Sequence, residues 1–363
     1  MHLKFFISIG TLKGDLMYNQ QAEMYEVGKI RISDCEMPEV SPDKVLIKVE
    51  CCGICGSDVH FFRYGRIGEK IAPIPFVLGH EISGTVVKIG ENVNNLKVGD
   101  RVAVEPGTPC GNCEMCRKGR YNLCENMEFL AAPPVGGALK MYIAHSANMC
   151  FKLPDNISFE QGALIEPLAV SMYACLRGDV GLGKTVCILG GGTIGILEVI
   201  CCKALGASKI IVSDLYDKKL QKASDRGADV VVNVTKENLE EAVMRATDGK
   251  GCDVVIEAAG VAATMSQTWK YVKKGGIIVV SGNVTEPVSY DFMSLMRKEA
   301  DIRTIWRYKN LYPTLIDAVS IGKINLDGIV TQRFQFDESE IAFNYCVNHA
   351  EDILKVLVNY HRP

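Results

Sequence analysis

Four cysteines, Cys110, Cys113, Cys116 and Cys124, stand close together in the stretch "CGNCEMCRKGRYNLC". Four thiolates at this spacing can surround one Zn²⁺ tetrahedrally, which leaves no coordination position for a substrate. We therefore expect a closed structural zinc site that pins a loop and performs no chemistry. The alternatives are disulfides, which are typical of short secreted domains, and a nucleic-acid zinc module, which needs a more basic environment.

A second set of candidate ligands is spread along the chain. Cys55 lies in "GICGSDVH", His80 and Glu81 lie in "VLGHE", and Glu166 lies in "LIEPLAV". One thiolate, one imidazole and one or two carboxylates suit zinc and leave a position open for water or an alcohol. Each residue alone is unremarkable, since a histidine beside a glutamate is more often solvated than ligating. Together with the glycine turn described next, they indicate a catalytic zinc.

The stretch "VCILGGGTIGILEV" places Gly190, Gly192 and Gly195 in G-x-G-x-x-G spacing. The motif closes an apolar run typical of a strand and opens a predicted helix, which is the context that a dinucleotide-binding turn requires. The first glycine permits the tight turn, the second lets the backbone approach a pyrophosphate, and the third allows close packing of helix on strand. The helix N-terminus would then face the phosphates. A glycine-rich turn without a ligand is the alternative.

Asp214 ends the run "IIVSD" that follows the glycine turn. A carboxylate at this position accepts hydrogen bonds from the adenosine ribose and repels a 2′-phosphate. We therefore expect NAD rather than NADP as the cofactor. Lys218 and Lys219 lie close by and weaken that preference without reversing it.

Length and composition limit the possible classes of protein. The chain has 363 residues, of which 48% are hydrophobic, and its net charge is −3. The length suggests about two domains, and the charge offers no field that would attract nucleic acid or an anionic membrane. We find no apolar run near the ~20 residues that span a bilayer.

Fifteen cysteines are many for a chain of this length. Outside the cluster most lie in apolar settings, such as Cys187, Cys201 and Cys202, and we expect these to be buried as small hydrophobic side chains. This usage indicates a reducing, cytoplasmic compartment. At the N-terminus, we expect Met17 to be the natural first residue and 1–16 to be a loosely held extension.

The pattern of apolar and polar residues changes twice along the sequence. From about 22 to 150, short β-rich runs are separated by glycine, proline and asparagine. From about 170 to 305, β-branched runs alternate with helical stretches, which predicts an α/β fold with a parallel sheet covered on both faces. The last 55 residues return to mixed character.

These motifs, in this order and spacing, resemble the zinc-dependent medium-chain dehydrogenases from about residue 22 onward. The stretches "HFFRYGRIG", "GRYNLC", "LPDNISFEQGALIEPLAV" and "WRYKN" are similar to the sorbitol (L-iditol 2-) dehydrogenase branch. The resemblance implies a GroES-like β-rich catalytic domain over 1–167 and 305–363. A Rossmann domain over 168–304 would bind NAD, and the substrate cleft would lie between the two.

The resemblance also assigns roles by position. Cys55, His80 and Glu81 match catalytic zinc ligands, and Glu166 matches a carboxylate that reaches the metal directly or through water. Asp58 matches a residue that orients the ligating histidine. Glu166 is also expected to offer a polar partner to the substrate. The remaining matches are Ser57 and His60 for a proton relay, Tyr64, Phe129, Arg307 and Tyr308 for the polyol pocket or nicotinamide end, and Thr193, Ile194, Lys219, Ser281, Gly282 and Asn283 for the cofactor.

The function implied is oxidation of a secondary hydroxyl of a polyol to a ketose, with hydride transfer to NAD and two zinc ions per subunit. Family members are usually homotetramers or dimers. The alternatives are a related dehydrogenase that acts on 2,3-butanediol, threonine or a sugar-alcohol phosphate, and a non-catalytic binding or structural protein on the same fold. The sequence disfavours the non-catalytic protein, because the ligands and the glycine turn are intact together.

Overall fold

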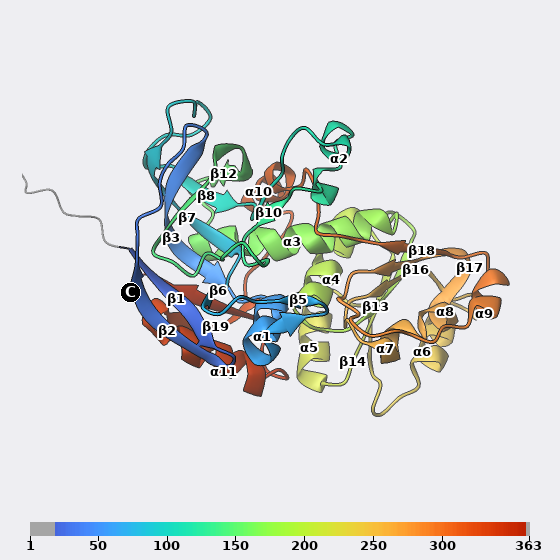
Figure 1. The fold of residues 1–363 in the computed structure, drawn as a ribbon. Coiled ribbons are helices and arrows are strands. Elements are labelled where there is room, and N and C mark those ends of the chain that lie inside the picture. The colour runs from blue at the N-terminus through green and yellow to red at the C-terminus, as the bar shows by residue number, and fades with distance from the viewer. Residues whose placement is uncertain (1–18, 361–363) are drawn as a thin grey trace, which may run out of the picture.

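A computed structural model describes residues 19–360, and the predicted extension over 1–16 lies outside them. Figure 1 shows a β-rich part and a part with a parallel sheet side by side, with the long helix α3 (Phe159–Arg177) between them. Within the described range, no helix combines the length and the apolar character needed to cross a membrane.

The β-rich part is built around a sheet in the order β12-β8-β7-β3-β20-β19, with β11 also paired to β3. Two of its strands come from the end of the chain, so the part is discontinuous in sequence. The strands are β3 (Lys44–Gly53), β7 (Glu81–Ile89), β8 (Arg101–Val104), β11 (Tyr142–Ser146), β12 (Cys150–Lys152), β19 (Val330–Gln335) and β20 (Lys355–Asn359).

Smaller elements surround this sheet. A three-stranded sheet has the order β2-β1-β6, and two further sheets of two strands each, β4-β5 and β9-β10, belong to the same part of the chain. The strands are β1 (Asn19–Glu26), β2 (Lys29–Cys35), β4 (Arg66–Ile67), β5 (Lys70–Ile71), β6 (Phe76–Val77), β9 (Gly107–Thr108) and β10 (Glu128–Phe129). The helices are α1 (Gly56–Tyr64), α2 (Glu114–Arg117), η1 (Tyr121–Leu123), η2 (Ala147–Met149), α10 (Tyr312–Ser320), η3 (Phe336–Glu338) and α11 (Ser339–Asn348).

The second part has six parallel strands in the order β15-β14-β13-β16-β17-β18. This is the doubly wound order, and its direction reverses between β13 and β16, where such sheets bind ligands. The predicted α/β class with a parallel sheet is therefore confirmed. The strands are β13 (Thr185–Leu189), β14 (Lys209–Asp214), β15 (Val230–Asn233), β16 (Cys252–Glu257), β17 (Val272–Val280) and β18 (Asp301–Thr304); the helices are α4 (Thr193–Leu205), α5 (Asp217–Asp225), α6 (Leu239–Ala246), α7 (Ala262–Met265), α8 (Thr268–Tyr271) and α9 (Phe292–Met296).

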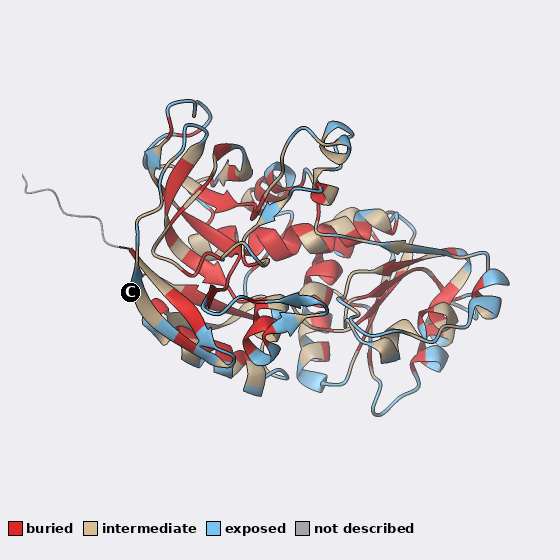
Figure 2. Ribbon diagram, in the orientation of Figure 1, coloured by how far each residue is buried: buried red, intermediate tan, exposed pale blue. Residues whose placement is uncertain are grey.

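Helix α3 connects the two parts. It begins at a capping box in which Ser158 and Gln161 satisfy each other's backbone N–H groups, and it contacts β7 and β8 on one side and α4 on the other. Most of its residues are buried, as Figure 2 shows. The helix runs through residue 167, so the domain boundary predicted there falls inside a continuous element and stays a prediction.

The large core cluster joins α3, α4 and the parallel sheet. Cys201 and Cys202 belong to it, and Cys187 belongs to the cluster on the other face of the sheet. All three are fully buried, which confirms their prediction as small hydrophobic side chains.

Candidate metal centres and cofactor site

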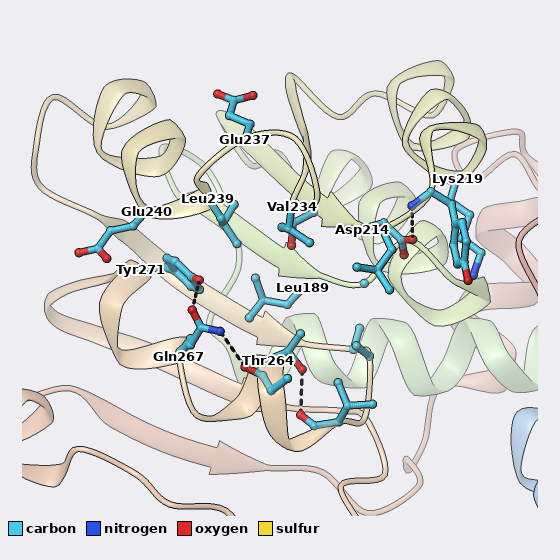
Figure 3. A pocket seen from close by; sticks show the side chains of 18 of the residues that line it. Leu189, Asp214, Lys219, Val234, Glu237, Leu239, Glu240, Thr264, Gln267 and Tyr271 are labelled. Atoms are coloured by element: carbon cyan, nitrogen blue, oxygen red, sulfur yellow. Dashed lines mark hydrogen bonds between the residues drawn. The ribbon is translucent and has the colours of Figure 1, made fainter.

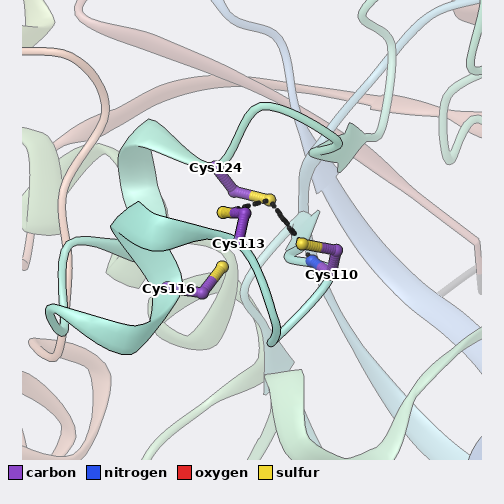
Figure 4. A group of neighbouring side chains, drawn as sticks. All are labelled: Cys110, Cys113, Cys116 and Cys124. Carbon is purple, nitrogen blue, oxygen red and sulfur yellow. Dashed lines mark hydrogen bonds between the residues drawn. The ribbon is translucent and has the colours of Figure 1, made fainter.

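The four-cysteine loop runs between β9 and β10, and it carries the short helices α2 and η1. The Sγ atom of Cys124 lies 3.5 Å from that of Cys110 and 3.9 Å from that of Cys113, and all four sulfur atoms lie within 4.8 Å of one another. Figure 4 shows the four side chains gathered in one place. Tetrahedral Zn–S bonds of about 2.3 Å place sulfur atoms about 3.8 Å apart, so the group fits a zinc ion.

Cys55, His80 and Glu81 also come together, with ligand atoms within 4.8 Å of one another. Strand β3 pairs antiparallel with β7 and places Gly53 opposite Glu81, while Cys55 follows β3 as the N-cap of α1. A Cβ atom on Gly53 would lie 2.1 Å from Oε2 of Glu81, so only glycine leaves room for this carboxylate. The donor set suits zinc and is not closed by a fourth cysteine.

Asp58 lies beneath this group and is buried. Its Oδ1 accepts a hydrogen bond from the backbone N–H of Gly79 at 3.1 Å, and its Oδ2 accepts one from the N–H of Cys55 at 3.3 Å. The same Oδ2 is 3.3 Å from Nδ1 of His80. One carboxylate therefore ties together the two segments that carry the candidate ligands, as an orienting residue does at a metal site.

Glu166 lies in the middle of α3 and does not belong to the three-residue group. Its Oε1 accepts a hydrogen bond of 3.0 Å from the hydroxyl of Tyr308, and burial raises the pKa of Glu166 to about 7. A buried carboxyl with this pKa gains and loses its proton near neutral pH. Its role as a metal ligand stays a prediction.

The other residues predicted to form the pocket lie near the same centre. The ring of Phe129 is 5.7 Å from the ring of His80, and the guanidinium carbon of Arg307 is 3.9 Å from the centre of the Phe129 ring. Burial lowers the pKa of Arg307 to about 10. Arg307 has a φ of 55°, a left-handed conformation that is rare for a long side chain and occurs at functional sites.

Helix α1 carries the two residues of the predicted relay. Ser57 and His60 are three positions apart, so they lie on one side of the helix. The Nδ1 atom of His60 is 2.7 Å from the carbonyl oxygen of Arg66, which can only accept, so Nδ1 is the donor and Nε2 stays free to accept a proton. Tyr64 lies alongside, with its ring 4.8 Å from that of His60.

The glycine turn closes β13 and opens α4. Gly190 has a φ of +113°, and a Cβ atom on Gly195 would lie 1.9 Å from the carbonyl oxygen of Gly190. A Cβ atom on Gly192 would meet nothing within 4 Å, so this face of the turn is open to a ligand. The turn therefore has the clearance that a pyrophosphate requires.

A cavity of about 720 Å³ begins at this turn and runs over the ends of β13 and β14 (Figure 3). Asp214 lies at its wall, where Oδ2 accepts a hydrogen bond of 2.7 Å from the N–H of Gly191. Of the predicted cofactor residues, Gly190, Gly192, Asp214 and Lys219 line this cavity, whereas Thr193, Ile194, Gly195, Ser281, Gly282 and Asn283 do not. Residues that the sequence did not indicate also line it, among them Tyr216, Glu237, Gln267 and Tyr271.

A short segment at the start of β20 joins the two sites. The hydroxyl of Thr193, at the start of α4, donates to the carbonyl oxygen of Leu354. The next residue, Lys355, donates from Nζ to both carboxylate oxygens of Glu81 at 2.7 Å. The glycine turn and the open metal group are thus two hydrogen-bonded steps apart, through a lysine that the sequence analysis did not single out.

Lys355 and Glu105 are the principal residues that sequence reasoning missed. Lys355 interrupts the apolar run "ILKVLVNY", and a charge inside a buried strand is a signal that could have found it. Glu105 follows β8 and accepts a hydrogen bond of 2.8 Å from Tyr121, and burial raises its pKa to about 7. Glu105 carries no comparable signal, because polar residues are common after a strand.

Comparison with protein families gives two matches. A model of the alcohol dehydrogenase GroES-like domain matches residues 41–155, and a model of the zinc-binding dehydrogenase matches residues 193–320. Human sorbitol dehydrogenase is 42% identical over 318 residues, which cover 87% of this chain and 89% of that protein.

Two solved structures are similar over nearly the whole chain. An Escherichia coli oxidoreductase of unknown specificity has a TM-score of 0.92 at 40% identity and covers 95% of this chain and 100% of its own. The 2R,3R-butanediol dehydrogenase of Bacillus subtilis has a TM-score of 0.86 at 33% identity and covers 94% of this chain and 100% of its own.

Proposed function

The chain belongs to the zinc-dependent medium-chain alcohol dehydrogenases, in their sorbitol dehydrogenase branch, and we infer that it oxidises a secondary hydroxyl of a polyol to a ketone. It is a zinc- and NAD-dependent oxidoreductase. The observation that carries the proposal is the contact between the two sites: Thr193 of the glycine turn bonds Leu354, and Lys355 bonds Glu81 of the metal group. Chemistry at the metal group and a cofactor on that turn would share one cleft.

We propose that Cys55, His80 and Glu81 hold the catalytic zinc and that the four-cysteine loop holds a structural one. When bound, the catalytic zinc lowers the pKa of a substrate hydroxyl and NAD accepts hydride from the carbon that carries it. Within the chain, Asp58 orients His80 through the 3.3 Å contact. Glu166 either completes the zinc site or binds a neighbouring hydroxyl of the substrate.

The proton released from the substrate needs a path to solvent. Ser57 lies two positions after Cys55, and its hydroxyl can accept the proton while it passes its own proton on. His60 can take it at Nε2, because its Nδ1 is committed to the carbonyl of Arg66. His60 is half-buried, so its imidazole can then return the proton to water.

The polyol chain needs polar groups along its length. Arg307 lies over Phe129 with its guanidinium free of any ion pair to the described acidic residues, so it can donate to substrate hydroxyls. Tyr308 and Glu166 supply a second hydrogen-bonded pair. Tyr64 lies beside His60, and its hydroxyl is a further candidate hydrogen-bond partner for the substrate.

Steady-state kinetics test this proposal. We expect NADH formation, followed by absorbance at 340 nm, with sorbitol, xylitol, iditol or galactitol and NAD⁺. The same panel includes 2,3-butanediol, threonine and sugar-alcohol phosphates, which represent the alternative dehydrogenases. Turnover of an alternative alone would replace the polyol, and turnover of no member by zinc-loaded protein would refute the proposal.

We also propose a cytoplasmic homo-oligomer, a tetramer or a dimer. Strand β18 lies at the edge of the parallel sheet, and Ile302 on it is exposed. Earlier in the same part of the chain, Phe292 and Met296 of α9 are 61% and 71% exposed. An open strand edge and exposed apolar side chains suit contact with a second copy of the chain. Light scattering tests this, and Ile302→Lys should reduce the assembly.

A further inference from the structure

Lys355 has an unusual environment for a lysine. Its side chain is 3% exposed and that of Glu81 is 1% exposed. The ammonium Nζ donates to both carboxylate oxygens of Glu81 at 2.7 Å and to the carbonyl oxygen of Ile54 at 3.1 Å. Among the residues that the structure describes, the hydrogen-bond partners of this ammonium belong to the segment and the strand that carry the open metal group.

The backbone around Lys355 is held from both parts of the molecule. Strand β20 pairs with β3, so that Leu357 faces Gly53, and the N–H of Leu354 donates to the hydroxyl of Thr331 at 3.1 Å. From the other part, Thr193 donates to the carbonyl of Leu354, and Lys218 forms an ion pair with Asp352. The backbone that carries Lys355 is thus held in place, and its ammonium lies beside Glu81 in a fixed position.

Contact with Lys355 does not prevent Glu81 from binding a metal. A carboxylate offers about four lone-pair positions, and one ammonium leaves some of them free. The conflict is electrostatic, because an ammonium buried beside the donor set repels a divalent cation bound to the same carboxylate. Burial makes this repulsion stronger than it would be in water.

We propose that Lys355 is a positioning residue that competes with the divalent metal for Glu81 and so determines how long the open site retains its metal. The proposal rests on the zinc site of the proposed function. In the absence of metal, Lys355 neutralises Glu81 and keeps the carboxylate in place. With metal bound, the same charge makes metal release faster.

The test measures zinc release from purified holoenzyme with a colour-forming chelator. Lys355→Gln removes the charge but keeps a hydrogen-bond donor, and Lys355→Arg keeps the charge. Arg333→Gln is the matched control, because it breaks the ion pair of Arg333 with Glu160 in the same part of the chain. We expect the faster of two release phases to slow by about tenfold or more in Lys355→Gln and to stay within about threefold in the other two variants.

A purely structural role predicts the opposite result. If Lys355 only supported the site, its replacement would loosen Glu81 and speed release, and that outcome, or an unchanged rate, would overturn the proposal. Lys355→Met is the second variant should Lys355→Gln give no holoenzyme, with the same slowing expected. A wild-type protein that shows a single zinc and no fast phase would instead refute the zinc site of the proposed function.

Discussion

Glu198 lies in the middle of α4 and is 0% exposed. Its Oε1 accepts a hydrogen bond of 2.8 Å from the hydroxyl of Ser281, whereas Oε2 receives none from the part of the chain that the structure describes. Glu257, also buried, lies close enough to repel it. Burial, with a smaller contribution from Glu257, raises the pKa of Glu198 from 4.5 to about 8.

This pKa makes the stability of the protein depend on pH. A carboxyl whose pKa is raised on folding binds its proton in the folded state and loses it in the unfolded state between the two pKa values. Stability from this group is therefore complete below pH 4.5 and is lost as pH rises through about 8. At ~1.4 kcal/mol per pH unit, raising pH from about 6 to 8 costs about 2 to 3 kcal/mol.

Glu198→Gln keeps the shape and the acceptor for Ser281 and cannot ionise. We expect the free energy of unfolding of the wild type to fall by about 2 to 3 kcal/mol more than that of the variant over this range. Urea denaturation at the two pH values measures this difference in the free energy of unfolding. The probe is tryptophan fluorescence, which reports on Trp269 packed against the same parallel sheet. Glu286→Gln, at an exposed position of the same part, is the control.

Other titrating groups are identical in the two proteins, so they cancel in the difference. If the difference in the free energy of unfolding between the wild type and Glu198→Gln is the same at both pH values, the reasoning is refuted. That result would mean that Glu198 is solvated or paired in the folded protein.

Four further predictions concern the site. Chelators should remove the open-site zinc and the activity before the four-cysteine zinc, so metal analysis at full inactivation should find one zinc per subunit, and parallel loss of both would contradict this. Arg307→Ala should lower kcat/KM for the polyol by about tenfold to a hundredfold with little change in NAD affinity, and unchanged kinetics would remove Arg307 from the pocket. Asp214→Ser should weaken NAD binding about tenfold and reduce discrimination against NADP, and an unaltered NAD to NADP ratio would contradict the assignment. His60→Ala should lower kcat and regain rate with added imidazole, and a variant as fast as wild type would exclude the relay.

The sequence predicted those features that residue type and local spacing encode. The four cysteines lie within one loop, and the glycine turn spans six residues, so both could be recognised without knowledge of the fold. The parallel sheet followed from β-branched runs alternating with helical stretches. The sequence indicated the open metal group through its occurrence together with these motifs, and not through the spacing of Cys55, His80 and Glu81.

Contacts between distant segments could not be predicted in this way. Lys355 and Glu198 are each an ionisable residue within an apolar run. The sequence does not indicate which partner stabilises either residue in its buried position. Their partners, Glu81 and Ser281, are far away along the chain and meet them only when β20 pairs with β3 and α4 packs on the parallel sheet. Buried ionisable residues are therefore where sequence patterns fail, because the free energy of burying them depends on tertiary neighbours.

The two metal groups differ in what assembles them. The cysteine loop carries its four ligands on one short stretch between β9 and β10, so the ligands come together without the pairing of strands that are distant in sequence. The open group needs β3 beside β7 for Cys55 and Glu81, and β20 beside β3 for Lys355. Its affinity for metal is therefore coupled to the integrity of the whole sheet, and any change that frays β20 should appear first as loss of zinc from the open site.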